Sequence, residues 1–289
     1  MKYSSLLYRQ GLPLEIKEEY SKSRIRNWYN YWQGNVYVAY SGGKDSNVLL
    51  HLVRSIYPKI PGVFIDTGLE FPEIREFVSE QENITVIKGK KSFYQVIQDY
   101  GYPLISKEIS QRIHAIKTTK SEKNRSVKMK KLSKKWYFLL DASFKISDRC
   151  CYLLKKYPSY KYEKDTHAVP YTGMMAQESA LRLQQYLKSG CNTLFAKRPK
   201  SNPIAFWTDK DIWDYHNKYS LQYSKIYDMG YKRTGCMFCM FGIHMEKSPN
   251  RFQRMKETHP QLYKYCMEKL ELNKVLDYIH THNSPAIQK

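Results

Sequence analysis

The chain has 289 residues, of which 42% are hydrophobic, and 48 basic against 27 acidic residues give it a net charge of +21. This length and composition suit one large α/β domain with a smaller appendage, or two modest domains, and exclude a fibrous or fully disordered chain. The sequence has no apolar run long enough for a membrane span, and its first twenty residues lack the apolar core of a signal peptide. We therefore expect a cytoplasmic protein. In such a reducing compartment, the six cysteines favour metal binding or catalysis over disulfide formation.

The elements follow one another in a regular order. Residues 1–34 are polar and aromatic and predict an N-terminal helical cap. A β-prone apolar run over 36–40 predicts a strand that leads through two glycines into a helix, because apolar residues then recur at helical spacing. The unit repeats: a strand over 62–65 precedes a helix that Pro72 opens and that runs through Phe77.

Two further strands are predicted, over 84–87 and 167–171, and a helix after the second ends near Gly190. Strands that alternate with helices indicate an α/β fold, with a mostly parallel twisted sheet and helices on both faces. Ligands bind such sheets at the carboxyl ends of the strands. We assign the α/β domain to residues 35–220 and a small, cysteine-bearing helical region to residues 221–289.

Two local signals complete the chain. Thr208 and Asp211 have the spacing of a capping box and predict the start of a helix. Later helices are expected to reach about Tyr278, and residues 280–289 to fray.

Residues 117–136 interrupt the alternation with nine Lys or Arg and one Glu, and predict an exposed basic insertion. Together with the net charge, this segment favours an anionic partner, and we interpret it as an arm that holds tRNA or DNA by its phosphates. The alternative is a solvated surface. An AT-rich coding sequence would also favour Lys, Tyr, Ile and Asn without any selection for binding.

The loop between the first strand and its helix carries the strongest signal, Ser41-Gly42-Gly43-Lys44-Asp45-Ser46. Two glycines allow backbone amides to turn toward phosphate oxygens, and the helix N-terminus adds unpaired N–H groups. Lys44 supplies a positive charge, the two serines supply hydroxyls, and Asp45 is suited to Mg²⁺. A simple strand-to-helix turn is the structural alternative. The loop differs from the Walker motif, which has four residues between its glycines.

This loop resembles the PP-loop of N-type ATP pyrophosphatases, which cleave ATP between its α- and β-phosphates. Three further segments resemble the phosphoadenosine phosphosulfate (PAPS) reductase branch of that superfamily: residues 64–72, residues 172–182 and residues 203–213. The resemblance implies an adenine nucleotide alpha hydrolase-like fold and a site for ATP and Mg²⁺. It implies Lys44 and Asp45 as catalytic residues, and nucleotide-binding roles for the loop and for Asp66, Thr67, Gly68, Gly173 and Arg182.

The cysteines form a second pattern, with Cys150 and Cys151 adjacent and Cys236 and Cys239 in a C-x-x-C. A C-x-x-C alone fits zinc, a redox dithiol or a cluster. Adjacent thiolates reach one small tetrahedral ion only with strain, whereas a [4Fe–4S] cube accepts them more easily. The adjacent pair also resembles the tandem-cysteine motif of iron–sulfur adenylylsulfate reductases. We therefore predict a [4Fe–4S] cluster on these four residues, with structural zinc or metal-free thiols as alternatives; Cys191 and Cys266 receive no role.

The pattern departs from that of sulfonucleotide reductases in three ways. Such enzymes use a cysteine in a Glu-Cys-Gly-type segment near the C-terminus, which we do not find, and their first loop is usually degenerate, whereas this one is intact. Met175 also stands where relatives often have arginine, which puts one anion contact in doubt.

From these departures we expect ATP-dependent adenylylation coupled to sulfur transfer onto a nucleic acid, with a sulfur-donor protein as a further possible partner. Two alternatives stay open. One is an adenylylsulfate or PAPS reductase, and the other is a catalytically silent nucleotide sensor that binds nucleic acid.

Overall fold

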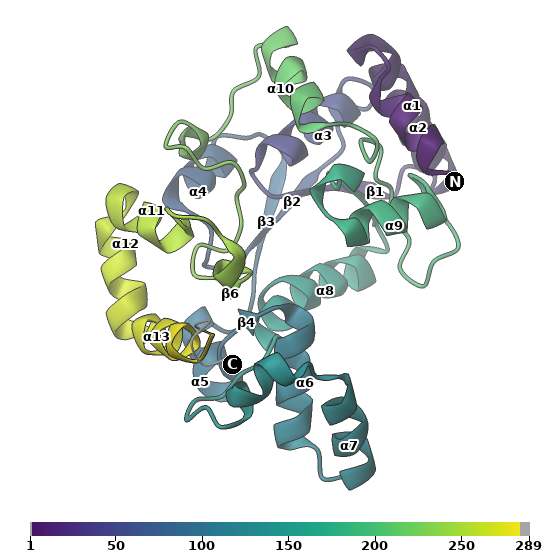
Figure 1. Cartoon of the computed structure of the whole chain (residues 1–289). Coiled ribbons are helices and arrows are strands. Elements are labelled where there is room, and N and C mark those ends of the chain that lie inside the picture. The colour runs from purple at the N-terminus through teal and green to yellow at the C-terminus, as the bar shows by residue number, and fades with distance from the viewer. Residues whose placement is uncertain (1, 284–289) are drawn as a thin grey trace. The chain divides into compact units, whose positions relative to one another are not determined.

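The computed structural model describes residues 2–283. The chain folds into two compact units (Figure 1). The first unit comprises Met1–Asp66, Glu70–Lys88 and Pro158–Thr234, and the second Thr67–Leu69, Gly89–Tyr157 and Gly235–Lys289. This division differs from the expected boundary at residue 220, because the segment Gly89–Tyr157 belongs to the same unit as the residues after Thr234.

The first unit holds a four-stranded parallel sheet in the order β3-β2-β1-β5. Its strands are β1 (Val36–Tyr40), β2 (Gly62–Asp66), β3 (Ile84–Lys88) and β5 (Val169–Thr172). Its helices are α1 (Tyr3–Gln10), α2 (Leu14–Tyr31), α3 (Lys44–Arg54), α4 (Pro72–Ser79), α8 (Tyr157–Thr166), α9 (Ala180–Ser189) and α10 (Asp209–Lys218). Short 3-10 turns cover Ala176–Glu178 and Lys225–Tyr227. The predicted α/β class with a parallel sheet is confirmed.

Successive side chains of each strand point to opposite faces of this sheet, so each face packs against different parts of the chain. On one face Tyr37 and Val63 form a buried cluster with Ala168, and Tyr162 of α8 packs against it. Helix α3 packs against β1 and buries its apolar side chains Val48, Leu49, Leu52 and Val53. The predicted capping box of Thr208 and Asp211 is present at the start of α10, and Pro72 occupies the first turn of α4.

Two expected boundaries need correction. β5 begins at Val169 instead of residue 167, because His167 has a φ of +57°, outside the extended range of a strand. The last helix continues to Asn283, past the predicted end near Tyr278, while residues 284–289 of the expected frayed tail lie outside the described residues.

The second unit is mainly helical. A pair of two-residue parallel strands, β4 (Leu104–Ile105) and β6 (Met240–Phe241), joins distant parts of the sequence. Its helices are α5 (Phe93–Tyr100), α6 (Lys107–Thr118), α7 (Glu122–Lys131), α11 (Arg251–Thr258), α12 (Pro260–Lys264) and α13 (Leu272–Asn283). Short turns of 3-10 helix cover Lys134–Leu140 and Ile243–Met245, and π-helical segments cover Cys151–Lys156 and Tyr265–Lys269. No helix within residues 2–283 combines the length and apolarity that a bilayer crossing requires.

Candidate active site

The loop between β1 and α3 has the backbone that its glycines predict. Gly42 adopts a φ of +71°, and a Cβ atom there would lie 2.7 Å from Cγ2 of Val78 and 2.9 Å from Cγ2 of Ile74, both on α4. A Cβ on Gly43 would lie 2.7 Å from Oγ1 of Thr234. Both positions therefore require glycine, one for its conformation and both for space.

Serine hydroxyls fasten the two ends of the loop together. The Ser41 amide donates to Oγ of Ser46 at 3.1 Å, and Ser46 Oγ donates to the Gly43 carbonyl at 2.8 Å. The first amide of α3, on Lys44, donates to the Tyr227 hydroxyl at 2.8 Å. Tyr227 thus occupies the acceptor position that a ligand oxygen could take at this helix N-terminus.

Lys44 is buried and has two carboxylate partners. Its Nζ lies 2.8 Å from Oδ1 of Asp45, also contacts Oδ1 of Asp209, and stands 5.8 Å from the centroid of the Trp213 ring. Burial on its own would lower the pKa of Lys44, but the two carboxylates outweigh it and raise the pKa. The ammonium group therefore stays charged inside the site, where the two carboxylates balance its charge.

A second cationic group lies near Asp45. Arg182 and Arg233 both pair with the carboxylate of Glu178, the latter at 3.1 Å, and Glu178 also accepts a hydrogen bond from the Met175 amide at 2.8 Å. Burial lowers the pKa of Arg182, as does the positive charge of Arg233, whereas Asp45 raises it. The predicted residue Arg182 is thus held beside a second arginine that no sequence motif indicates.

Gly173 lies directly against the loop, as a Cβ atom there would stand 3.2 Å from the Asp45 carbonyl oxygen. The structure therefore brings Gly173, Arg182 and the residues 41–46 together within the first unit. Asp66 ends β2 in the same unit, where its carboxylate pairs with Arg75 at 2.6 Å and with Lys88 at 3.7 Å. Thr67 and Gly68 belong to the second unit, where Oγ1 of Thr67 accepts the Leu69 amide at 3.2 Å.

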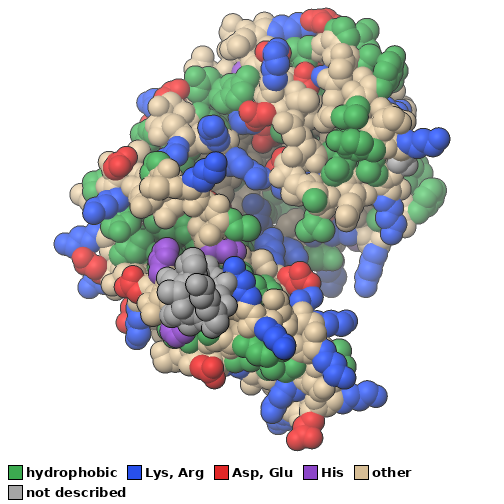
Figure 2. Space-filling view, viewed as in Figure 1, with side chains coloured by type: hydrophobic (Ala, Val, Ile, Leu, Met, Phe, Trp, Pro, Cys, Tyr) green, Lys and Arg blue, Asp and Glu red, His purple; other side chains and the backbone are tan. Residues whose placement is uncertain are grey.

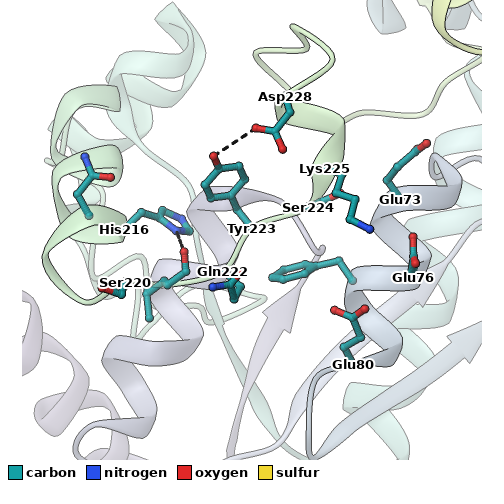
Figure 3. Close-up of a pocket in the computed structure, with 13 residues that line it drawn as sticks. Glu73, Glu76, Glu80, His216, Ser220, Gln222, Tyr223, Ser224, Lys225 and Asp228 are labelled. Carbon is teal, nitrogen blue, oxygen red and sulfur yellow. Dashed lines mark hydrogen bonds between the residues drawn. The ribbon is translucent and has the colours of Figure 1, made fainter.

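An acidic cavity of about 600 Å³ lies on another side of the loop (Figure 3). Glu73, Glu76 and Glu80 form one wall, opposite Tyr223 and His216. His216 connects this cavity to the loop, because its Nε2 lies 3.2 Å from the Lys44 carbonyl oxygen. Three carboxylates on one wall would repel phosphate, so this cavity suits the nucleotide less than the cationic side of the loop does.

The four predicted cysteine ligands all lie in the second unit and influence one another electrostatically. A hydrogen bond with Cys150 lowers the pKa of Cys151 to about 6, with further help from Lys107 and Lys155. The same hydrogen bond, burial and the thiols of Cys236 and Cys239 raise the pKa of Cys150.

The setting of these thiols suits an anionic cluster in charge and donor type. The guanidinium group of Arg251 donates to the Cys239 carbonyl at 3.0 Å and, with the two lysines, adds positive charge around them. Within residues 2–283, no three His, Cys, Asp or Glu side chains are arranged to bind one metal ion together.

Comparison with known proteins agrees with this architecture. Residues 35–103 and 103–241 match the phosphoadenosine phosphosulfate reductase domain, and the chain belongs to this family. It is 25% identical over 266 residues to the uncharacterized protein MJ0973 of Methanocaldococcus jannaschii, covering 89% of this chain and 54% of that protein. It is 24% identical over 220 residues to adenosine 5'-phosphosulfate reductase of Bacillus cereus, covering 76% of this chain and 79% of that enzyme.

Among solved structures, the PAPS reductase of Candida auris superposes with a TM-score of 0.46 at 17% identity, over 82% of this chain and 96% of that one. The chain spans about half the length of the curated archaeal relatives that it matches, at 54% and 45%.

Proposed function

We propose that this protein is an enzyme that adenylylates an acceptor with ATP, releases pyrophosphate and couples the activated product to sulfur transfer. The observation that carries the proposal is the phosphate loop, with a positive φ at Gly42, a buried Lys44 and no room for a side chain at Gly42 or Gly43. A protein that merely held a strand and a helix together would need none of these features. The family membership supports adenine nucleotide chemistry at this position.

The reaction can be written from the groups present. An acceptor oxygen attacks the α-phosphorus of ATP, the bond to the β-phosphate bridging oxygen breaks, and pyrophosphate leaves with that electron pair. Lys44 neutralises negative charge that grows on the leaving group, and Asp45 would hold Mg²⁺. Arg182 and Arg233 orient the α-phosphate or the acceptor. Sulfide released by a donor protein then attacks the activated atom of the acceptor, and AMP leaves with the electron pair of the bond between that atom and oxygen.

We propose further that Cys150, Cys151, Cys236 and Cys239 would hold a [4Fe–4S] cluster, with one thiolate on each iron. Protein purified without oxygen should then contain about four irons per chain. Serine at any of the four positions should lower the iron content and the brown colour, whereas Cys266→Ser should not. Stoichiometric zinc with no iron would contradict this part of the proposal.

The acceptor that we propose is a nucleic acid. Helix α7 has no buried side chain and carries Lys123, Arg125, Lys128, Lys130 and Lys131. Figure 2 shows Lys and Arg side chains gathered over the segment that Figure 1 labels α7. Because a small sulfonucleotide has few negative charges, such a basic helix favours a polyanion.

A sulfonucleotide reductase is the second candidate, favoured by the relative of that name and by the cysteine pattern. The test supplies ATP with RNA, or adenosine 5'-phosphosulfate with a dithiol reductant, in separate reactions and measures pyrophosphate and sulfite. We expect the wild type to release pyrophosphate from ATP. Lys44→Ala should lower the rate of release at least a hundredfold, which corresponds to about 2.7 kcal/mol for one lost electrostatic contact. The exposed control Lys59→Ala should keep the wild-type rate. Sulfite with no pyrophosphate would assign the protein to the reductases. If the protein binds nucleotide but forms neither product, the remaining candidate is a catalytically silent nucleotide sensor.

A further inference from the structure

A cavity of about 740 Å³ lies in the first unit, apart from the phosphate loop. Residues of α1, α2 and the segment 189–194 line it, and Figure 1 shows α1 and α2 next to α9, the helix that leads into that segment. Its polar side chains include Arg9, Arg24, Asn27, Asn30 and Asn192. All residues that line it are described, and none is acidic. Its volume falls within the range of sites for small ligands, about 300–1,000 Å³.

Arg9 and Arg24 both line this cavity. Arg9 Nη1 donates to the Tyr186 hydroxyl at 3.0 Å, and neither Arg9 nor Arg24 has an ion-pair partner among residues 2–283. Burial raises the pKa of both Tyr186 and Cys191, whereas the positive charges of Arg9 and Arg24 lower the pKa of both groups. Arg9 and Arg24 thus bring two positive charges without a carboxylate partner to one cavity. An anion is the complementary ligand for such a site.

The cavity is built on a fixed scaffold. The Asn192 side chain donates to the Arg24 carbonyl at 3.1 Å and accepts from the Ser201 hydroxyl at 2.7 Å. Ser201 in turn bridges to Tyr171 in β5. The segment that forms one wall is therefore tied to α2 on one side and to the central sheet on the other, so the two walls keep their spacing.

We propose that this cavity binds one nucleotide unit of a single-stranded nucleic acid. Arg9 and Arg24 would pair with its phosphate, while the exposed amides of Asn27 and Asn30 offer both donors and acceptors to a base edge. Tyr31, which is 50% exposed at the same site, offers a ring for stacking. This inference rests on the proposed nucleic-acid acceptor and adds a second contact besides α7.

Two pairs of matched variants test it. Asn27→Asp places a carboxylate in the cavity, and Ser23→Asp places the same charge on an exposed position of α2 outside it. Arg24→Ala removes a lining charge, and Arg26→Ala removes an exposed charge from the same helix. Binding of a labelled single-stranded RNA of about 12 nucleotides is measured by fluorescence anisotropy, with 5'-AMP at the same nucleotide concentration as competitor. Circular dichroism and thermal unfolding verify that each variant is folded.

We expect Asn27→Asp and Arg24→Ala each to weaken RNA binding about tenfold, and their controls about twofold or less. Equal effects within each pair would overturn the inference while leaving the nucleic-acid acceptor in place through α7. If 5'-AMP abolishes the difference between Asn27→Asp and Ser23→Asp, the cavity binds a free mononucleotide, and the strand is excluded. If the wild type binds no RNA at all, both this inference and the proposed acceptor fail.

Discussion

At the scale of single residues, the conformation of Gly42 fixes the phosphate loop. Its φ of +71° and the 2.7 Å that would separate a Cβ atom there from Val78 leave no room for a side chain. We expect Gly42→Ala to lower the free energy of unfolding by about 1–3 kcal/mol and to impair ATP binding. Gly11→Ala is the matched control, because Gly11 has a φ of −82° and its nearest neighbours would stand 3.6 Å away. Urea unfolding of both variants gives the comparison, and equal costs would contradict this role of Gly42.

A buried ion pair outside the loop is the second residue-scale prediction. Lys17 Nζ lies 2.7 Å from both carboxylate oxygens of Asp211, and the lysine is only 2% exposed. Removing one partner would leave the other charged and buried, so Lys17→Met should cost about 3–5 kcal/mol. Lys22→Met, which removes a surface pair with Glu19, should cost about 1 kcal/mol or less. Chemical denaturation measures both, and a small cost for Lys17→Met would show that the pair is dispensable.

Such pairs mark the limit of prediction from sequence at this scale. The loop residues were predictable because six of them are contiguous and lie between a strand and a helix. Asp209 lies 165 positions along the sequence from its partner Lys44, and Tyr227 lies 183 positions from Lys44. Arg233 is 55 positions from its partner Glu178. Only folding brings these groups together, and no local sequence pattern predicts them.

At the scale of elements, helix α7 is the clearest case for a role other than folding. It has no buried side chain, so packing does not explain why its sequence is so basic. We expect that replacing its five basic residues with Gln changes the unfolding free energy by less than about 0.5 kcal/mol. The same change should flatten the slope of log affinity for nucleic acid against log salt by up to about 3.5–4.5, since each of five phosphate contacts contributes about 0.7–0.9.

A charge-matched control replaces five exposed lysines outside the insertion, namely Lys59, Lys90, Lys210, Lys264 and Lys274. Both variants lose five positive charges, so the comparison separates the position of the charge from its total. If the two slopes are equal, α7 is only a solvated surface, and the small-substrate reductase candidate gains support.

Elements with a clear apolar period were predictable, and the shortest ones were not. Strands β1, β2 and β3 agree with the expected ranges to within one residue, and α3 and α4 lie where helices were expected after β1 and β2, because apolar period and glycine or proline boundaries mark them. The pair β4 and β6 has two residues in each strand, too few to show a period. The π-helical segment that begins at Cys151 likewise has no signature in a single sequence.

At the scale of the whole molecule, the two kinds of candidate site fall in different units. The phosphate loop, Gly173 and Arg182 lie in the first unit, and the four cysteines lie in the second. The chain passes between the units at five places: Asp66 and Thr67, Leu69 and Glu70, Lys88 and Gly89, Tyr157 and Pro158, and Thr234 and Gly235. The sequence suggested both sites but not this interleaving, because a division that crosses the chain several times leaves no compositional boundary.

We propose that the loop at Ser41–Ser46 cleaves ATP between its α- and β-phosphates. The most direct measurement is the identity of the nucleotide formed from ATP labelled at the α-phosphate, in the presence of Mg²⁺ and RNA, for the wild type and for Lys44→Ala. We expect labelled AMP or an AMP-linked acceptor with an equal amount of pyrophosphate, and neither product in the variant. Labelled ADP with inorganic phosphate, or cleavage that survives in Lys44→Ala, would contradict the claim.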